Sequence, residues 1–237
     1  MAITRLNKFI SDCGVTSRRK AEELILQGRV SINDKIVLEL SQKIDTEVDI
    51  VMLDGERLRP KHHVYFLLNK PKGVVTTTDD EKNRKTVIDL IKTREKIFPV
   101  GRLDYDTTGA LILTNDGEFS NLLTHPKNKI PRVYEVKLDK PLNEEDKEKL
   151  STGVFIKGKK GRFIKAAFTG KKDKRFVTVT AVEGRNHFVK NMFGALGYKV
   201  LALNRNSYAG IVCNIPVGMH RILTREEISG VIENYGN

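Results

Sequence analysis

Apolar and polar residues alternate most regularly along the segment RVYEVKL, residues 132–138. Tyr134, Val136 and Leu138 fall on one face of an extended chain, and the charged positions between them fall on the other. This period of two residues is typical of a strand that is buried on one side. Apolar or β-branched runs predict further strands at residues 64–69, 110–114, 176–182 and 199–203.

Apolar residues three and four positions apart predict the helices. One such stripe, at Leu6, Phe9 and Ile10, precedes Gly14, and a second follows the capping residue Ser17 and runs to residue 27. Further helices are predicted from Asp116 or Gly117, over residues 143–150 and 186–196, and after the capping box TREE at 224–227.

Strands and helices do not alternate strictly, which favours an α+β fold with a largely antiparallel sheet. Short strands at residues 30–32, 35–37 and 49–53 complete a small α/β module with the first two helices. The polar segment 58–63 contains Pro60 and interrupts the periodicity, so it is the predicted linker. We therefore expect two domains, at residues 1–60 and 64–237.

Composition places the chain among ordinary globular proteins. Its 237 residues are 39% hydrophobic and 30% charged. No apolar run approaches the roughly 20 residues that span a bilayer, and the start MAITRLNKFI lacks the apolar stretch of a signal peptide. We therefore expect a cytoplasmic protein with no membrane partner. Cys13 and Cys213 form no C-x-x-C pattern, and His62 and His63 lack a third ligand nearby, so no metal site is predicted.

The positive charge is unevenly distributed along the chain. The formal net charge is +12, yet residues 1–60 carry 10 basic and 10 acidic residues. Residues 157–175 alone hold nine Lys or Arg residues against one acidic residue, Asp173. Such a segment is either a solvated loop or a contact for phosphates, and the net charge of the whole chain favours a polyanionic partner.

The segment PVGRLDYDTTGALILTNDG, residues 99–117, carries the candidate chemistry. Its pattern predicts a strand, a turn and a second strand, with Arg102 and Asp104 on the same face and close together. A structural ion pair at a sheet edge is one interpretation of this spacing. A functional carboxylate is the other.

The same residues resemble the active-site motif of the bacterial rRNA pseudouridine synthases. The resemblance continues through EFSNLLTHP and RVYEVKL to EGRNHFVKNMFGALGYKV. It implies that Asp104 is catalytic, that Arg102 helps to open the RNA, that Tyr134 stacks on the base and serves proton removal, and that Lys190 pairs with the aspartate. Leu203 is expected to line the pocket. No cofactor and no metal are implied. Phe188 departs from the family, in which many members carry Gln.

Residues 4–37 resemble the S4 RNA-binding module. The basic start of the second predicted helix opposes the helix dipole, which suggests a contact with phosphate. The residues expected to bind RNA are Arg5, Lys8, Arg18, Arg19 and Lys20 in this module, with Arg185, Lys171, Lys172 and Lys174 in the second domain.

These observations predict an rRNA pseudouridine synthase that acts as a monomer on 23S rRNA or a precursor ribosomal particle. The alternatives are a 16S rRNA target and a non-catalytic RNA-binding protein of ribosome assembly or translation control. The second alternative does not explain a complete set of Asp, Tyr and Lys. A glycosidase is disfavoured because no second carboxylate occupies a partner position.

Overall fold

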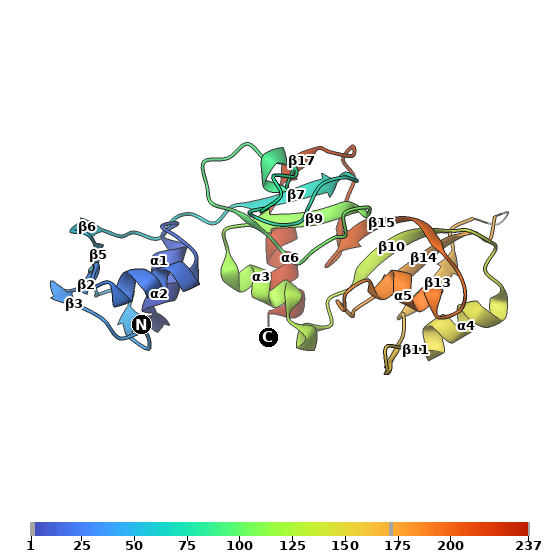
Figure 1. Cartoon of the computed structure of the whole chain (residues 1–237), viewed down its shortest axis with the longest axis horizontal. Helices are drawn as coiled ribbons and strands as arrows, with labels where there is room; N and C mark the ends of the chain where they lie inside the picture. The colour runs from blue at the N-terminus through green and yellow to red at the C-terminus, as the bar shows by residue number, and fades with distance from the viewer. Residues whose placement is uncertain (1–2, 171–172, 237) are drawn as a thin grey trace. The chain divides into compact units, whose positions relative to one another are not determined.

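The computed structural model describes residues 3–170 and 173–236, and the chain divides into two compact units, Met1–Val64 and Tyr65–Asn237 (Figure 1). Each unit has its own cluster of buried apolar side chains. No helix in these described ranges is long and apolar enough to cross a membrane.

The first unit, drawn in blue in Figure 1, combines two helices with short strands. The helices are α1 (Leu6–Asp12) and α2 (Arg18–Leu26). The strands are β3 (Lys35–Ile36), β2 (Val30–Ile32), β5 (Val51–Leu53) and β6 (Glu56–Arg57), in that order in one sheet, and the pair β1 (Ile3–Arg5) and β4 (Lys43–Asp45).

The predicted helices of this unit are confirmed, and so is their buried side. Leu6, Phe9 and Ile10 of α1 pack with Ala21 and Ile25 of α2 in one cluster. The Ser17 side chain caps α2 by accepting a hydrogen bond from the backbone N–H of Lys20. Strands β2, β3 and β5 lie within the predicted short strands, whereas strands β1, β4 and β6 were not predicted.

The second unit is built on one mixed sheet, which confirms the predicted α+β fold. Within the described residues its main path runs β13 (Lys165–Phe168), β14 (Phe176–Ala181), β10 (Arg132–Leu138), β15 (Val200–Tyr208), β9 (Thr108–Thr114), β7 (Tyr65–Lys70) and β17 (His220–Ile222). Two short strands join its side, β16 (Ile211–Val212) on β15 and β8 (Phe98–Pro99) on β9. A separate hairpin consists of β11 (Val154–Ile156) and β12 (Lys159–Gly161).

The pair β9 and β15 is parallel, whereas the neighbouring pairs along the main path are antiparallel. The two strands approach closely at Gly109, which stands opposite Arg205. A Cβ atom at Gly109 would lie 2.3 Å from the carbonyl oxygen of Arg205, and φ of Gly109 is +107°. Only glycine fits this position without a shift of one strand. Because parallel strands begin at the same end, the segments that precede β9 and β15 are brought together.

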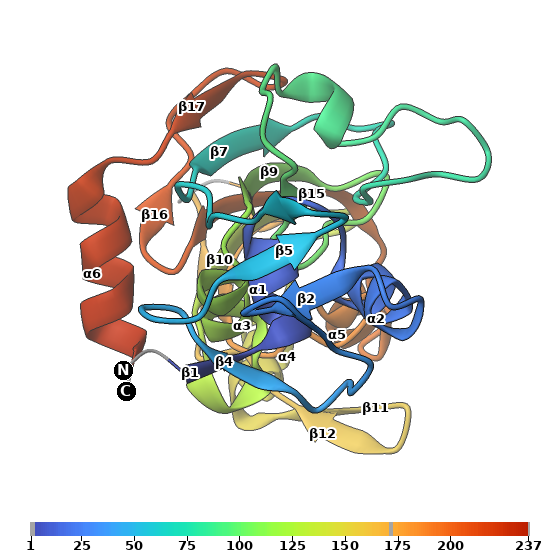
Figure 2. The ribbon, with the colours of Figure 1, turned by 90° about the vertical axis from the view of Figure 1, so that its left-hand side faces the viewer.

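Helices pack around this sheet. They are α3 (Gly117–Thr124), α4 (Glu144–Thr152), α5 (Phe188–Gly194) and α6 (Arg225–Tyr235), with short 3-10 turns η1 (Ile88–Leu90) and η2 (Pro126–Asn128). Phe119 and Leu123 of α3 and Val231 of α6 pack with Ala110 and Ile112 of β9. Ile211 of β16 and Val231 of α6 belong to one buried cluster, and Figure 2 shows α6 beside β16. The predicted capping box is present at Thr224 and Glu227.

Two predictions in this unit are wrong in detail. Residues 100–107 form a loop, not the first strand of a hairpin, because Gly101 has φ of +72° and turns the chain after the two residues of β8. Strand β15 runs on to Tyr208 and does not stop at Leu203. The polar residues after Leu203 hid this continuation, since Arg205 is a charged residue in a buried strand position.

Candidate active site

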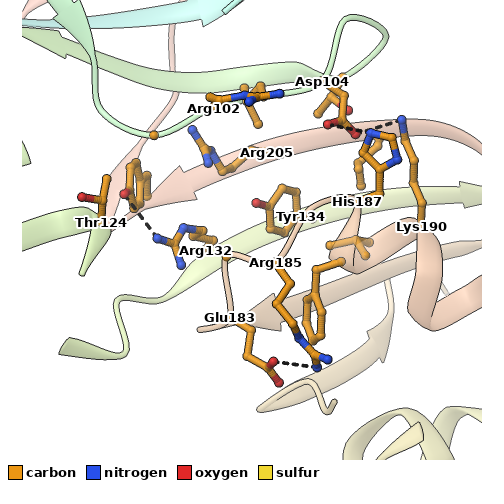
Figure 3. Close-up of a pocket in the computed structure, with 18 residues that line it drawn as sticks. Arg102, Asp104, Thr124, Arg132, Tyr134, Glu183, Arg185, His187, Lys190 and Arg205 are labelled. Carbon is orange, nitrogen blue, oxygen red and sulfur yellow. Dashed lines mark hydrogen bonds and ion pairs between the residues drawn. The ribbon is translucent and has the colours of Figure 1, made fainter. Parts of the chain in front are cut away.

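A cavity of about 170 Å³ opens beside the loop 100–107 in the second unit (Figure 3). This volume is below the 300–1,000 Å³ that is typical of sites for drug-sized ligands, and it suits a single ring. The loop contributes Arg102 and Asp104 to the lining, β10 contributes Tyr134, and β15 contributes Leu203. The segment that leads into α5 and the helix itself contribute His187 and Lys190.

A buried lysine, Lys70, forms hydrogen bonds with the backbone of the loop that carries Asp104. The Nζ of Lys70 donates hydrogen bonds to the carbonyl oxygens of Asp104 (3.0 Å), Thr107 (3.1 Å) and Pro71 (3.1 Å). Burial lowers the pKa of Lys70 from its ordinary 10.5 to about 8, and the charges of Asp104 and Asp106 act in the opposite direction.

A threonine, Thr76, forms hydrogen bonds with the same loop at Leu103, the residue before Asp104. The Thr76 hydroxyl donates to the Leu103 carbonyl at 2.7 Å, and the Leu103 N–H lies 3.3 Å from the same hydroxyl. Residues far away in the sequence thus determine where Asp104 lies, which explains why a local pattern mispredicted the loop.

The Asp104 carboxylate faces two side chains from the start of α5. Lys190 Nζ lies 3.0 Å from Oδ2, and His187 Nε2 lies 3.5 Å from Oδ1. Lys190 also donates to Asp106 at 2.6 Å. Burial of Lys190 opposes its charge, but its hydrogen bonds with Asp106 and Asp104 outweigh this and raise its pKa. The bond to Lys190 in turn lowers the pKa of Asp106. The pairing of Lys190 with Asp104, which the family resemblance implies, is therefore present in the geometry.

Arg102 does not pair with Asp104 as its spacing suggested. Its side chain is exposed and lines the cavity, but within the described residues no ion pair joins it to the carboxylate. The physical reason is the loop conformation, because residues two positions apart share a face only in an extended strand. The structural ion-pair interpretation of Arg102 and Asp104 is wrong.

The sheet forms another wall of the cavity. Tyr134 on β10 stands opposite Arg205 on β15, and Val136 stands opposite Leu203. Tyr134 and Leu203 are buried, with 9% and 6% of their surface exposed. The alternation predicted for residues 132–138 is confirmed, and it directs the Tyr134 side chain toward the cavity (Figure 3).

Two buried arginines complete this wall and were missed from the sequence. Arg132 donates to the carbonyl oxygens of Ile130 (3.3 Å), Val182 (3.2 Å) and Leu123 (3.2 Å). Both Arg132 and Arg205 lie against the ring of Tyr208, at 5.0 and 4.6 Å from its centroid. A signal existed for Arg132, because it shares the strand face of Tyr134. Lys70 and His187 were also missed, since neither residue carries a local pattern.

A second, larger cavity of about 560 Å³ adjoins the first and shares Thr124, Arg132, Glu183, Gly184 and Arg185 with it. Its further lining includes Lys129 from the end of η2 and Arg162 from the basic segment. Arg185 lies at the junction, where it pairs with Glu183 at 2.7 Å and donates to the Lys160 carbonyl at 3.3 Å. The two cavities together form a hollow with an excess of basic side chains.

The other basic residues that were expected to bind RNA lie on different parts of the chain. Arg5 and the first-turn residues Arg18, Arg19 and Lys20 are exposed on the first unit. Lys8 forms an ion pair with Asp12 at 3.2 Å. Lys174 pairs with Glu144 at 3.2 Å and lies over the Phe168 ring. Lys171 and Lys172 lie outside the described residues. The role of these residues in RNA binding stays a prediction.

This arrangement offers a carboxylate, a phenol and several cations around a space for one ring. The charge-assisted bond to Lys190 orients the carboxylate toward that space. Within residues 3–170 and 173–236 no group of three His, Cys, Asp or Glu residues is placed to hold a metal ion.

Comparisons with known proteins agree with this geometry. Residues 64–195 match the model of the RNA pseudouridylate synthase family, and residues 4–51 match the S4 domain. The chain is 42% identical to the ribosomal large subunit pseudouridine synthase B of Bacillus subtilis, over 94% of this chain and 93% of that protein. It is 39% identical to an uncharacterized RNA pseudouridine synthase of Aquifex aeolicus, over 100% of this chain and 96% of the relative.

A solved structure supports the same conclusion. The crystal structure of a pseudouridylate synthase superimposes with a TM-score of 0.68 at 34% identity, and the match covers 96% of this chain and 99% of the other. Phe188, the departure from many family members, is buried in the lining of the cavity and stacks edge to face with Phe163 at 5.7 Å. The chain belongs to the RNA pseudouridine synthases, with an S4 domain before the synthase domain.

Proposed function

We propose that this pseudouridine synthase isomerises a uridine of large-subunit rRNA and that Asp104 is its catalytic carboxylate. The observation that carries the assignment is the position of the carboxylate: it lines a cavity for one ring, 3.0 Å from Lys190 and together with Tyr134 and Leu203. The relative from Bacillus subtilis, whose name specifies the large ribosomal subunit, supports the target.

The reaction breaks the bond between N1 of uracil and C1′ of ribose and forms a bond between C5 and C1′. The carboxylate of Asp104 either attacks the sugar or removes a sugar proton, so that uracil is released with the electron pair of the broken bond. The ring then turns within the cavity, and C5 bonds to C1′ as the bond between Asp104 and the sugar breaks or the abstracted sugar proton is returned. The C5 proton is lost and N1 gains one, so the atoms and charge of the nucleoside are unchanged.

The other side chains serve this sequence in distinct ways. Lys190 holds the carboxylate and balances its charge. Tyr134 and Leu203 lie on the same wall of the cavity, where the phenol ring stacks on the base and its hydroxyl serves removal of the C5 proton. Arg102, exposed at the mouth, contacts the RNA that has been opened around the flipped nucleotide.

The RNA that flanks the target nucleotide is proposed to follow the second cavity. Lys129, Arg162 and Arg185 line it and offer positive charge close to the catalytic cavity. Phosphate groups on either side of a flipped nucleotide would meet these side chains. The protein is proposed to act as a monomer, because described residues of the second unit line the cavity without a second copy. The cytoplasm is the proposed location, because the rRNA of the bacterial relative is found there.

Mapping of pseudouridine in rRNA tests this proposal. Pseudouridine retains a carbodiimide adduct that stops reverse transcription, so rRNA from cells with and without the gene can be compared position by position. We expect one stop to be lost from large-subunit rRNA and restored by the wild-type gene but not by Asp104→Asn. A stop lost from small-subunit rRNA would overturn the target, and restoration by Asp104→Asn would overturn the role of the carboxylate.

A further inference from the structure

A buried arginine in the catalytic cavity has an unused hydrogen-bond donor. Only 2% of the Arg205 surface is exposed, and the residue lines the cavity. Its Nε donates to the Ala110 carbonyl at 2.7 Å. Its Nη2 is also buried, yet it has no hydrogen-bond partner among the described residues. A buried N–H without an acceptor is costly, and the cost is greater on a charged group.

Arg132, a second buried arginine beside the same ring, differs from Arg205 in the hydrogen bonds of its outer nitrogens. Both guanidinium groups lie against the ring of Tyr208. The Nη1 and Nη2 atoms of Arg132, however, donate to the carbonyl oxygens of three residues from surrounding segments, whereas Arg205 uses only Nε in this way. The outer nitrogens of Arg132 are thus hydrogen-bonded within the fold, whereas Nη2 of Arg205 is available to another acceptor.

The position of Arg205 limits what that acceptor can be. It stands opposite Tyr134 in the strand register (Figure 3). Leu203, which also lines the cavity, lies two positions earlier on the same strand. Arg102 is exposed and Arg185 is half-buried, so these two side chains are better placed to contact phosphate groups of RNA outside the cavity. Because Arg205 lines the cavity, a group that enters the cavity approaches its guanidinium, and the uracil ring is the part of the RNA that enters. Uracil presents two acceptors, the oxygens O2 and O4.

We propose that Nη2 of Arg205 donates a hydrogen bond to a carbonyl oxygen of the target uracil. The proposal rests on the proposed function of the cavity and adds to it a residue that binds and stabilises the base. When the N1–C1′ bond breaks, its electron pair stays on uracil, and the negative charge spreads to O2 and O4. Arginine remains charged under all conditions of catalysis. A fixed cation beside these oxygens therefore stabilises the released base more than the neutral ring of the substrate.

Sulfur substitution in the RNA tests this contact without changing the protein. RNA that contains the mapped target site is prepared with uridine, 2-thiouridine or 4-thiouridine at that position, and the C-nucleoside is measured by chromatography after digestion. A thiocarbonyl is a weak acceptor. We expect the single-turnover rate of the wild type to fall about 10-fold to 100-fold with sulfur at the contacted position, as for loss of a charge-assisted bond, and less with sulfur at the other.

Variants separate the contact from the intrinsic chemistry of the thio bases. Arg205→Met should be slow with uridine but should process the sensitive thio RNA within about threefold of its own rate with uridine, because the discriminating donor is gone. Arg132→Met, a matched loss of a buried arginine on the same Tyr208 ring, should keep the wild-type ratio. Circular dichroism of each variant checks its fold, and Arg205→Lys serves as a less disruptive replacement if Arg205→Met unfolds.

The outcomes distinguish this inference from the proposed function. An active wild type that tolerates sulfur at both positions within twofold would overturn the role of Arg205 and leave the function intact. Unchanged discrimination by folded Arg205→Met, which lacks the donor, would have the same meaning. A wild type that forms no C-nucleoside from the uridine RNA would instead contradict the proposed function itself.

Discussion

The polar side chains around the cavity differ in whether they form hydrogen bonds or ion pairs within the protein. Asp104 and Lys190 bind each other, and Arg132 is bonded to backbone carbonyls. The Tyr134 hydroxyl, by contrast, forms no hydrogen bond with any side chain or backbone group in the described ranges, although the residue is buried, with only 9% of its surface exposed. At the scale of the residue, we therefore propose Tyr134 as a group that exchanges a proton with the substrate.

Replacement of Tyr134 by Phe tests whether its hydroxyl takes part in the chemistry. Phe keeps the aromatic face, and stacking of a base is worth on the order of 1 to 3 kcal/mol, so loss of stacking alone cannot explain a large effect. If the hydroxyl serves removal of the C5 proton, the single-turnover rate of Tyr134→Phe should fall by about 100-fold or more.

RNA with 5-fluorouridine at the target supplies the control for this variant. Fluorine replaces the C5 hydrogen, so the step assigned to the hydroxyl cannot occur. Wild type and Tyr134→Phe should consume this RNA at similar rates. Equal rates of the two proteins on normal RNA would reduce Tyr134 to a stacking surface.

At the scale of the elements, the site depends on the parallel pairing of β9 with β15. The loop before β9 carries Asp104, and helix α5 before β15 carries Lys190, so the pairing brings the two charges together. Residue Gly109 permits this pairing, because a side chain there would collide with the backbone of Arg205.

Gly109→Ala should therefore destabilise the fold and displace the site. The added Cβ would need to lie 2.3 Å from a backbone oxygen, at a φ of +107° that L side chains rarely adopt. We expect a loss of about 3 kcal/mol or more in the free energy of unfolding, measured by urea denaturation.

Gly117→Ala is the matched control for this substitution. Gly117 opens helix α3, has no atom within 4 Å of the added Cβ, and has no positive φ. Its replacement should be neutral or stabilising by up to about 1 kcal/mol. Equal stability of the two variants would contradict the proposed close approach of β9 and β15.

Elements with a strong period could be predicted from the sequence, and those held by distant contacts could not. Residues 132–138 alternate because one face is buried, so both the strand and the direction of Tyr134 were predictable. The loop around Asp104 depends on Lys70 and Thr76, which no local pattern connects to it. Arg205 broke the pattern of β15 because a buried cation has the sequence signature of a turn or surface position.

At the scale of the whole molecule, the chain combines an S4 domain with a synthase domain. The first unit has no excess of basic residues over residues 1–60, but three cations are exposed in the first turn of α2. Their charges oppose the helix dipole, so they are kept at a small cost in helix stability. This cost suggests that they contact phosphate.

The triple variant Arg18→Gln, Arg19→Gln and Lys20→Gln tests that role. It should weaken RNA binding and lower the slope of log Kd against log salt concentration by about 2, since each phosphate contact contributes roughly 0.7 to 0.9. The fold should be no less stable, because the substitutions remove the conflict with the dipole. The rate at saturating RNA should stay within about threefold of the wild type.

A second triple variant supplies the control for the loss of charge. Lys35, Lys43 and Arg57 are also exposed on the first unit, and their replacement by Gln removes the same charge from other elements. An equal change of slope in both variants would mean that RNA binding depends on the net charge of the unit and not on the cations at the start of α2.

The central claim is that Asp104 performs the isomerisation, and one comparison tests it most directly. Asp106 is a neighbouring carboxylate that also binds Lys190, at 2.6 Å, but it does not line the cavity. Asp104→Asn and Asp106→Asn therefore remove the same charge from the same ion-pair network. Single-turnover formation of pseudouridine in the mapped rRNA fragment should be undetectable with Asp104→Asn and within about tenfold of the wild type with Asp106→Asn. Comparable activity of Asp104→Asn and the wild type would contradict the account.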